Sequence, residues 1–85
     1  MKISIDKDIT NSTYGISYMD RSGNRPKLKY IAEGLKKEKE AVKIAKEFLK
    51  NKGLERGDEV WEVYGAIWHY TGSKWHAEYP AGYLK

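Results

Sequence analysis

The 85-residue sequence contains no cysteine, two prolines and a single phenylalanine. Without cysteine, the chain can form neither a disulfide bond nor a thiolate metal site. It also lacks the apolar run of a signal peptide near its N-terminus, and no apolar segment approaches the length of a membrane-spanning helix. We therefore expect a soluble, cytoplasmic protein that folds as one small domain over residues 1–85 with a modest core.

Motifs that would identify an enzyme are also missing. The glycines that punctuate the chain, such as Gly34, Gly53 and Gly57, do not form a phosphate-binding loop. The serines fall mostly in predicted turns or on strand faces, and no residue pattern pairs one of them with a general base. We therefore expect a non-catalytic protein without a cofactor.

One amphipathic helix is predicted over residues 34–53, GLKKEKEAVKIAKEFLKNKG. Its apolar residues recur at the spacing of one helix face and are Ala41, Ile44, Ala45, Phe48 and Leu49, with Val42 at the edge. Glutamates near the start and lysines near the end suit the helix dipole, and Gly53 can cap the C-terminus. Because Phe48 lies in the middle of the apolar stripe, we expect it to anchor the core.

Strands are predicted on both sides of this helix. Alternating residues indicate strands at 2–6, 13–20 and 26–32 before it, and at 60–71 and 74–79 after it. Gly65 predicts a bulge or bend within the fourth strand. The predicted fold class is α+β, an antiparallel sheet of four to five strands with one amphipathic helix packed on one face, in the order β-β-β-α-β-β.

The first hairpin allows two registers. A three-residue turn pairs Ile16 with Leu28 and Tyr14 with Tyr30, whereas a two-residue turn opposes Ile16 to Ile31. We favour the three-residue turn because it keeps the apolar residues on one face, toward the helix.

The second hairpin turns at Gly72-Ser73. A two-residue turn there pairs His69 with His76 and Tyr70 with Trp75. Glu78 then shares the face of the two histidines. Two imidazoles on neighbouring strands can reach one metal ion, but a structural zinc site normally has four ligands and no fourth is obvious. We therefore expect no metal site here.

Aromatic residues gather in this C-terminal part of the chain. Trp68 and Trp75 are expected to pack under the helix, where they supply bulk to a core with little leucine and phenylalanine. Trp61 has the opposite strand parity from Trp68, so we expect it to point away from the helix. This parity makes Trp61 the candidate for an exposed interface residue.

Positive charge concentrates on the helix and on the hairpin before it. Residues 36–53 carry seven lysines and three glutamates, whereas residues 54–85 carry three basic and five acidic groups. The segment 20–29, which we call the basic hairpin, contains Arg21, Arg25, Lys27 and Lys29 with Asp20 as its one acidic residue. Such a basic surface can attract nucleic acid or an acidic protein, although exposed helix lysines commonly serve only for solubility.

The segment of about residues 13–52 resembles the small arm-type DNA-binding module at the N-terminus of phage tyrosine integrases. The matching pieces are DRSGNR in the hairpin and KKEKEAV in the helix. That family has a three-stranded sheet and one helix, and its sheet enters the major groove. The resemblance implies DNA contacts by Arg21, Arg25, Lys27 and Lys29. The residues after Gly53 have no counterpart in that family.

Two functions are compatible with these features. The first is a small nucleic-acid-binding module that uses the basic hairpin, with an affinity that falls as salt rises. The second is a protein-interaction or inhibitor domain, of phage or bacterial type, that docks through the aromatic hairpin or a sheet edge.

Overall fold

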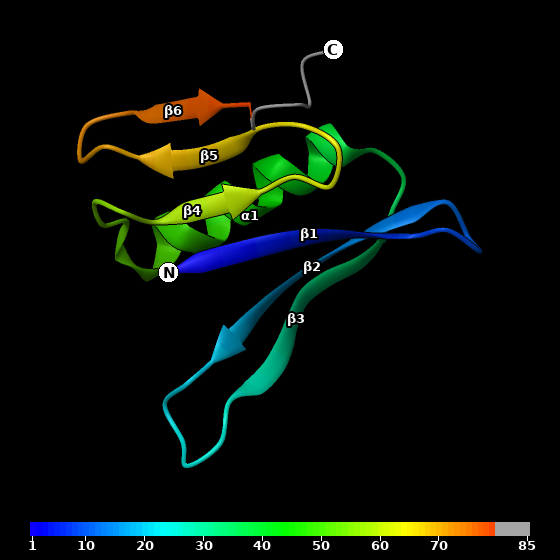
Figure 1. Cartoon of the computed structure of the whole chain (residues 1–85), viewed down its shortest axis with the longest axis horizontal. Coiled ribbons are helices and arrows are strands. Elements are labelled where there is room, and N and C mark those ends of the chain that lie inside the picture. The colour runs from blue at the N-terminus through cyan, green and yellow to red at the C-terminus, as the bar shows by residue number, and fades with distance from the viewer. Residues whose placement is uncertain (80–85) are drawn as a thin grey trace.

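The computed structural model describes residues 1–79, which form one α-helix and a six-stranded sheet (Figure 1). In chain order the elements are β1 (Lys2–Asp8), β2 (Thr13–Asp20), β3 (Lys27–Leu35), α1 (Glu38–Gly53), β4 (Glu59–Trp61), β5 (Ile67–Tyr70) and β6 (Trp75–Glu78). The predicted α+β class with a single helix is confirmed. None of the helical structure within residues 1–79 combines the length and apolar character needed to cross a membrane.

The sheet has the strand order β3-β2-β1-β4-β5-β6. Four of its neighbouring pairs are antiparallel, but β1 and β4 run parallel, with Ile3 beside Val60. The prediction of a purely antiparallel sheet of four to five strands is therefore wrong. A parallel pair needs a long crossover connection, and here that connection consists of β2, β3 and α1.

The strand predicted over residues 60–71 is in fact two strands. β4 and β5 pair antiparallel, with Val60 opposite Trp68, and residues 62–66 turn the chain between them. The Glu62 amide donates to the Ala66 carbonyl at 3.1 Å, and the Glu62 carboxylate accepts a hydrogen bond from the Trp68 indole. Gly65 packs so closely against that carboxylate that a side chain there would collide with it. Gly65 thus marks a reversal of the chain, not a bulge or bend in one strand.

The helix begins later than predicted, at Glu38. Gly34 belongs to β3 and adopts a positive φ of 72°, a conformation that favours glycine. Lys37 precedes the helix with an extended backbone and no side-chain cap. The Glu38 carboxylate accepts a hydrogen bond from the Val63 amide at 2.8 Å, which ties the start of α1 to the turn after β4.

The predicted register of the first hairpin is wrong. Asp20 pairs with Lys27, so residues 21–26 form a longer connection, and Ser17 lies opposite Tyr30. The register shifts between Ser17 and Ile16, where one extra residue, Ile31, is inserted into β3. Because of this bulge, the residues of β3 on either side of Ile31 point to opposite faces of the sheet, whereas simple alternation would place them on the same face.

As a consequence, the apolar residues of β3 divide between the two faces of the sheet. Ala32 packs against the core on the helix side, and a second register shift, between Ile16 and Tyr14, places Leu35 on that side as well. Leu28 and Tyr30, which were expected on that side, lie exposed on the other face. Lys27 and Lys29, which the three-residue turn would place on the face away from the helix, lie on the helix side instead.

The core lies between α1 and the middle strands. Its largest fully buried side chains are Ile3, Ile16, Leu49 and Val60. α1 turns its Ala41, Ala45 and Leu49 edge to the sheet, so the predicted apolar face is confirmed. Phe48 lies at the flank, half-buried, with its ring centroid 5.5 Å from that of Tyr18. The prediction that Phe48 anchors the core is wrong, because Leu49 occupies the central position.

The C-terminal hairpin has the predicted register. Tyr70 pairs with Trp75 and His69 with His76, and the Thr71 amide donates to the Lys74 carbonyl at 2.9 Å. As expected, Trp68 and Trp75 pack against the core. The Lys46 ammonium lies 3.5 Å from the Trp68 ring centroid and covers it from the helix.

α1 covers one face of the sheet, and no element within residues 1–79 covers the other, which we call the uncovered face (Figure 1). Alternation along the strands assigns it the side chains of Lys2, Ser4, Ser17, Met19, Leu28, Tyr30, Glu59, Trp61, Ile67, His69, His76 and Glu78.

Candidate nucleic-acid interface

The basic hairpin projects from the body of the molecule (Figure 1). It is formed by the ends of β2 and β3 and by the connection over residues 21–26. Every residue from 21 to 30 is exposed. A ligand can therefore approach this hairpin from several directions without displacing other parts of the described chain.

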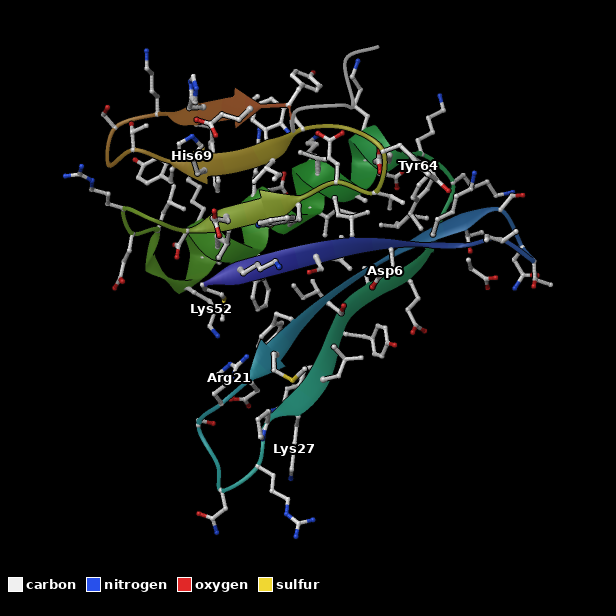
Figure 2. The ribbon with its side chains drawn as sticks, in the orientation of Figure 1. Asp6, Arg21, Lys27, Lys52, Tyr64 and His69 are labelled. Carbon is white, nitrogen blue, oxygen red and sulfur yellow. The ribbon has the colours of Figure 1, made fainter. Side chains whose placement is uncertain are left out.

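The four predicted nucleic-acid-binding residues all lie on this hairpin and are exposed. They are Arg21, Arg25, Lys27 and Lys29. Figure 2 shows Arg21 at the end of β2 and Lys27 at the start of β3, on opposite sides of the connecting loop. The fold thus gathers four cations on one narrow projection.

One of these cations already has a partner. Lys29 forms a salt bridge with Asp20, with 3.1 Å between Nζ and Oδ2. Hydrogen bonds from the Ser22 hydroxyl and amide, followed by the contact with Lys29, hold the pKa of Asp20 well below its ordinary value. Asp20 in turn raises the pKa of Lys29. Among residues 1–79, no carboxylate forms an ion pair with Arg21, Arg25 or Lys27, so these three remain available to an external anion.

The uncovered face next to the hairpin combines apolar and cationic side chains. Met19, Leu28 and Tyr30 are 45%, 53% and 58% exposed. Met19 and Leu28 line a hollow of about 460 Å³, and Lys2 and Arg21 are also among its lining residues. These two cations come from β1 and from the loop after β2, so the sheet extends the positive charge of the hairpin toward its own centre.

Trp61 also lies on the uncovered face, where its parity was expected to place it. It stands beside Ser4 of β1 and Ile67 of β5 and is half-buried. The Lys2 ammonium lies 4.0 Å from its ring centroid, and the indole N–H donates to Glu59 at 3.5 Å. Trp61 is therefore partly covered by its neighbours and offers less free surface than Tyr30.

Negative charge gathers at the opposite end of β1. A second hollow, of about 560 Å³, is lined by the acidic residues Asp6, Asp8 and Glu33, and also by Lys7 and Tyr30. Hydrogen bonds from the Asn11 side chain and backbone lower the pKa of Asp8. Figure 2 shows Asp6 well separated from Arg21 and Lys27. The surface is thus basic at the hairpin and acidic at the other end of the first strands.

Lys2 and Met19 were not predicted as parts of this surface. The alternation of Lys2 with Ile3 and Ile5 was a usable signal, because it assigns Lys2 to the face opposite the core. Its proximity to Arg21 depends on the pairing of β1 with β2, which the sequence did not reveal. Comparison of the chain with family models, curated proteins and solved structures gave no match.

Proposed function

We propose that this protein is a small non-catalytic module that binds nucleic acid through the basic hairpin and acts in the cytoplasm. The observation that carries the proposal is the set of three exposed cations without ion-pair partners among residues 1–79, Arg21, Arg25 and Lys27, on a projecting hairpin. The sequence resemblance to arm-type DNA-binding modules points to the same residues.

The chemistry of these side chains suits a phosphate backbone. Guanidinium groups bind phosphate oxygens in a bidentate manner, and a lysine ammonium binds them as a point charge. A two-stranded ribbon is also narrow enough to enter the major groove of duplex DNA. The hairpin is such a ribbon, with Lys27 and Lys29 on β3 and Arg21 and Arg25 in the connecting loop.

The charges of the neighbouring surface favour one placement of the ligand. Lys2 and Arg21 line the hollow beside the hairpin, so a phosphate chain can continue from the hairpin onto the uncovered face. The exposed ring of Tyr30, which lines the edge of the acidic hollow, offers a stacking surface for an unpaired base where the two regions meet. Asp6, Asp8 and Glu33 repel phosphate at the far end of β1 and limit the contact to the basic side.

An electrophoretic shift assay with random duplex and single-stranded oligonucleotides at about 50 and 200 mM salt tests the proposal. The wild type should bind at low salt and lose affinity at high salt. The double variant Arg25→Ala with Lys27→Ala should bind more weakly. Its slope of log affinity against log salt should fall by about 0.7–0.9 for each removed charge, because fewer counterions are released. Its melting temperature should stay nearly unchanged, since both residues are exposed.

A matched control separates the hairpin from the overall charge. Lys39→Ala with Lys43→Ala removes the same two charges from the exposed side of α1. This control should keep most of the wild-type affinity. Equal loss in both double variants would mean that net charge alone drives binding, and a wild type that does not bind even at low salt would exclude the nucleic-acid function.

The second candidate is a protein-interaction or inhibitor domain, and a specific observation favours it as the alternative. Met19, Leu28 and Tyr30 form an exposed apolar group on the uncovered face, and β3 and β6 are the outer strands of the sheet described. Apolar contacts and strand addition depend little on salt. If nucleic acid does not bind, this apolar group becomes the leading interface, and Trp61 of β4 lies on the same face of the sheet.

A further inference from the structure

Three side chains with metal-binding atoms meet on the uncovered face of the C-terminal hairpin. His69 of β5 lies directly opposite His76 of β6. Glu78 follows His76 by two residues and so projects from the same face. Figure 2 labels His69 on β5, distant from the basic hairpin. This cluster is therefore separate from the proposed nucleic-acid interface and does not depend on it.

The possible ligand atoms of the three residues lie about as close together as atoms that bind the same metal ion. Glu78 Oε1 lies 3.5 Å from His69 Nε2 and 3.8 Å from His76 Nε2, and one possible ligand atom from each residue lies within 4.8 Å of the others. Two ligand atoms bound tetrahedrally at about 2.1 Å from zinc are roughly 3.4 Å apart. Hydrogen bonds between the same atoms would be shorter, about 2.7–3.2 Å. The observed spacing is closer to coordination than to hydrogen bonding.

A second observation concerns His69 alone. Its Nε2 atom is buried from solvent and has no hydrogen-bond partner among residues 1–79. A buried polar atom without a partner destabilises the folded state, and such atoms are rare in native proteins. The unpaired nitrogen lies on the side of the ring nearest Glu78, so a cation between them would satisfy it.

We propose that His69, His76 and Glu78 bind a divalent transition-metal ion, of which zinc is the best match. Two imidazole nitrogens and one carboxylate oxygen suit zinc, whereas magnesium and calcium prefer oxygen ligands throughout. A site with three protein ligands leaves a position open to water or to an external donor. Water or an external donor can therefore take the place of the fourth protein ligand that a structural zinc site would need.

A further carboxylate, outside the cluster, lies on the neighbouring strand. Glu59 of β4 lies directly across from His69, on the side away from His76. Its negative charge strengthens the attraction for a cation at His69. The bound ion would join β5 to β6 across the hairpin and would stabilise the folded chain, because the three ligands come together only in that state.

Calorimetric titration with zinc chloride, and with cobalt chloride followed by visible absorption, tests the proposal on the whole chain. The wild type should bind one zinc ion per chain, and zinc should raise its melting temperature. His76→Ala and Glu78→Gln should each weaken zinc binding by at least about tenfold. Loss of a residue that only supports a metal ligand already costs about 10–100-fold in affinity, and these two residues are the proposed ligands themselves. Both side chains are more than half exposed, at 52% and 64%, so neither change should disrupt the fold.

Glu55→Gln provides the matched control, because Glu55 is an exposed glutamate outside the cluster. It should leave zinc affinity and the zinc-induced change in melting temperature unchanged. The chain has two histidines, and both lie in this cluster, so a loss with His76→Ala identifies the site without ambiguity. A wild type that does not bind zinc at micromolar concentration, or a His76→Ala variant that binds as tightly as the wild type, would overturn the proposal.

Discussion

Leu49 and Phe48 are neighbours in α1 but lie in different surroundings. Leu49 is 2% exposed and belongs to the buried cluster with Ile3 and Val60. Phe48 is half-buried at the flank, against the ring of Tyr18, and the ammonium of Lys52 lies near both rings. The smaller side chain therefore contributes more to stability.

We expect Leu49→Ala to lower the free energy of unfolding by about 2–5 kcal/mol, because it removes buried methyl groups and leaves a cavity. Phe48→Ala should cost less, about 1–2 kcal/mol, since the ring is only partly removed from water. For a domain of this length the total free energy of unfolding is about 4–13 kcal/mol. If the value lies near the lower limit, Leu49→Ala should leave the protein close to unfolding. Urea denaturation of both variants measures the two values. A larger cost for Phe48→Ala would contradict the observed packing of the helix.

Asp20 is the residue that restrains the charge of the basic hairpin. It holds Lys29 in a salt bridge and accepts hydrogen bonds from Ser22. Because folding depresses the pKa of Asp20, its contribution to stability is present above the unfolded pKa and is lost as the pH falls through the folded pKa. Asp20 lies on the projecting hairpin, where solvent screens its charge, so this contribution is small.

Under the proposed function, Asp20→Asn should strengthen nucleic-acid binding. The change removes one negative charge and releases Lys29, so the slope of log affinity against log salt should steepen by up to about 0.9. The electrophoretic shift assay described above measures this change beside Arg25→Ala with Lys27→Ala, which should shift the slope in the opposite direction. Weaker binding by Asp20→Asn would instead show that the carboxylate positions the hairpin for its ligand.

Among the elements, the hairpin of β2 and β3 and the C-terminal hairpin of β5 and β6 differ in how far their sequences specify them. The C-terminal hairpin has a two-residue turn at Gly72, whose φ of 104° favours glycine, and this turn sets the register that we predicted. The first hairpin has a six-residue connection over 21–26 and a bulge at Ile31. Neither feature has a sharp sequence signal, so the predicted pairing of Ile16 with Leu28 was wrong. The predicted basic residues still gather there, because their location needs only the hairpin and not its register.

The helix and the fourth predicted strand were specified in part. The apolar spacing predicted the buried face of α1, but not its start, because Lys36 and Lys37 suit a helix as well as a loop. Gly65 correctly indicated irregular backbone, but the prediction of a bulge or bend underestimated it, because the chain reverses direction there. Only its packing against Glu62, in a turn that also hydrogen-bonds Trp68, makes it a reversal between two strands.

At the scale of the whole molecule, the parallel pair of β1 and β4 joins two antiparallel halves into one sheet. The pairing is supported at its edge by Met1, whose ammonium lies 2.8 Å from the buried Asp58 and whose carbonyl accepts from the Glu59 amide at 2.8 Å. α1 packs across β1, β2, β3 and β4 and so spans this junction. The basic hairpin lies outside this packed region, where a binding surface can be exposed without weakening the core.

Amide hydrogen exchange should reveal this division. The amides of β1 and β4 that take part in the sheet should exchange most slowly, because both strands are paired on each side and carry the buried Ile3, Ile5 and Val60. Residues 21–26 should exchange fastest, since they are exposed and lie outside the strands. Exchange followed by NMR measures both sets. Slow exchange over 21–26 in the free protein would mean that the hairpin is held by contacts that the structure does not contain.

The sequence by itself determined the features that depend on neighbours a few residues apart. These are the single helix and its apolar face, the register of the C-terminal hairpin, the outward direction of Trp61 and the cluster of cations at 20–29. Periodicity and short turns encode them, because each residue's surroundings are set within one or two turns of chain.

The tertiary structure alone decided the features that depend on residues far apart. The pairing of Ile3 with Val60, the bulge at Ile31 and the hollow between Lys2 and Arg21 all depend on which strands become neighbours. The sequence predicted that His69, His76 and Glu78 share one face of the hairpin. It did not predict the spacing of their ligand atoms or the unpaired His69 nitrogen. Strand neighbours are selected by the burial of the whole core, and no local pattern carries that information.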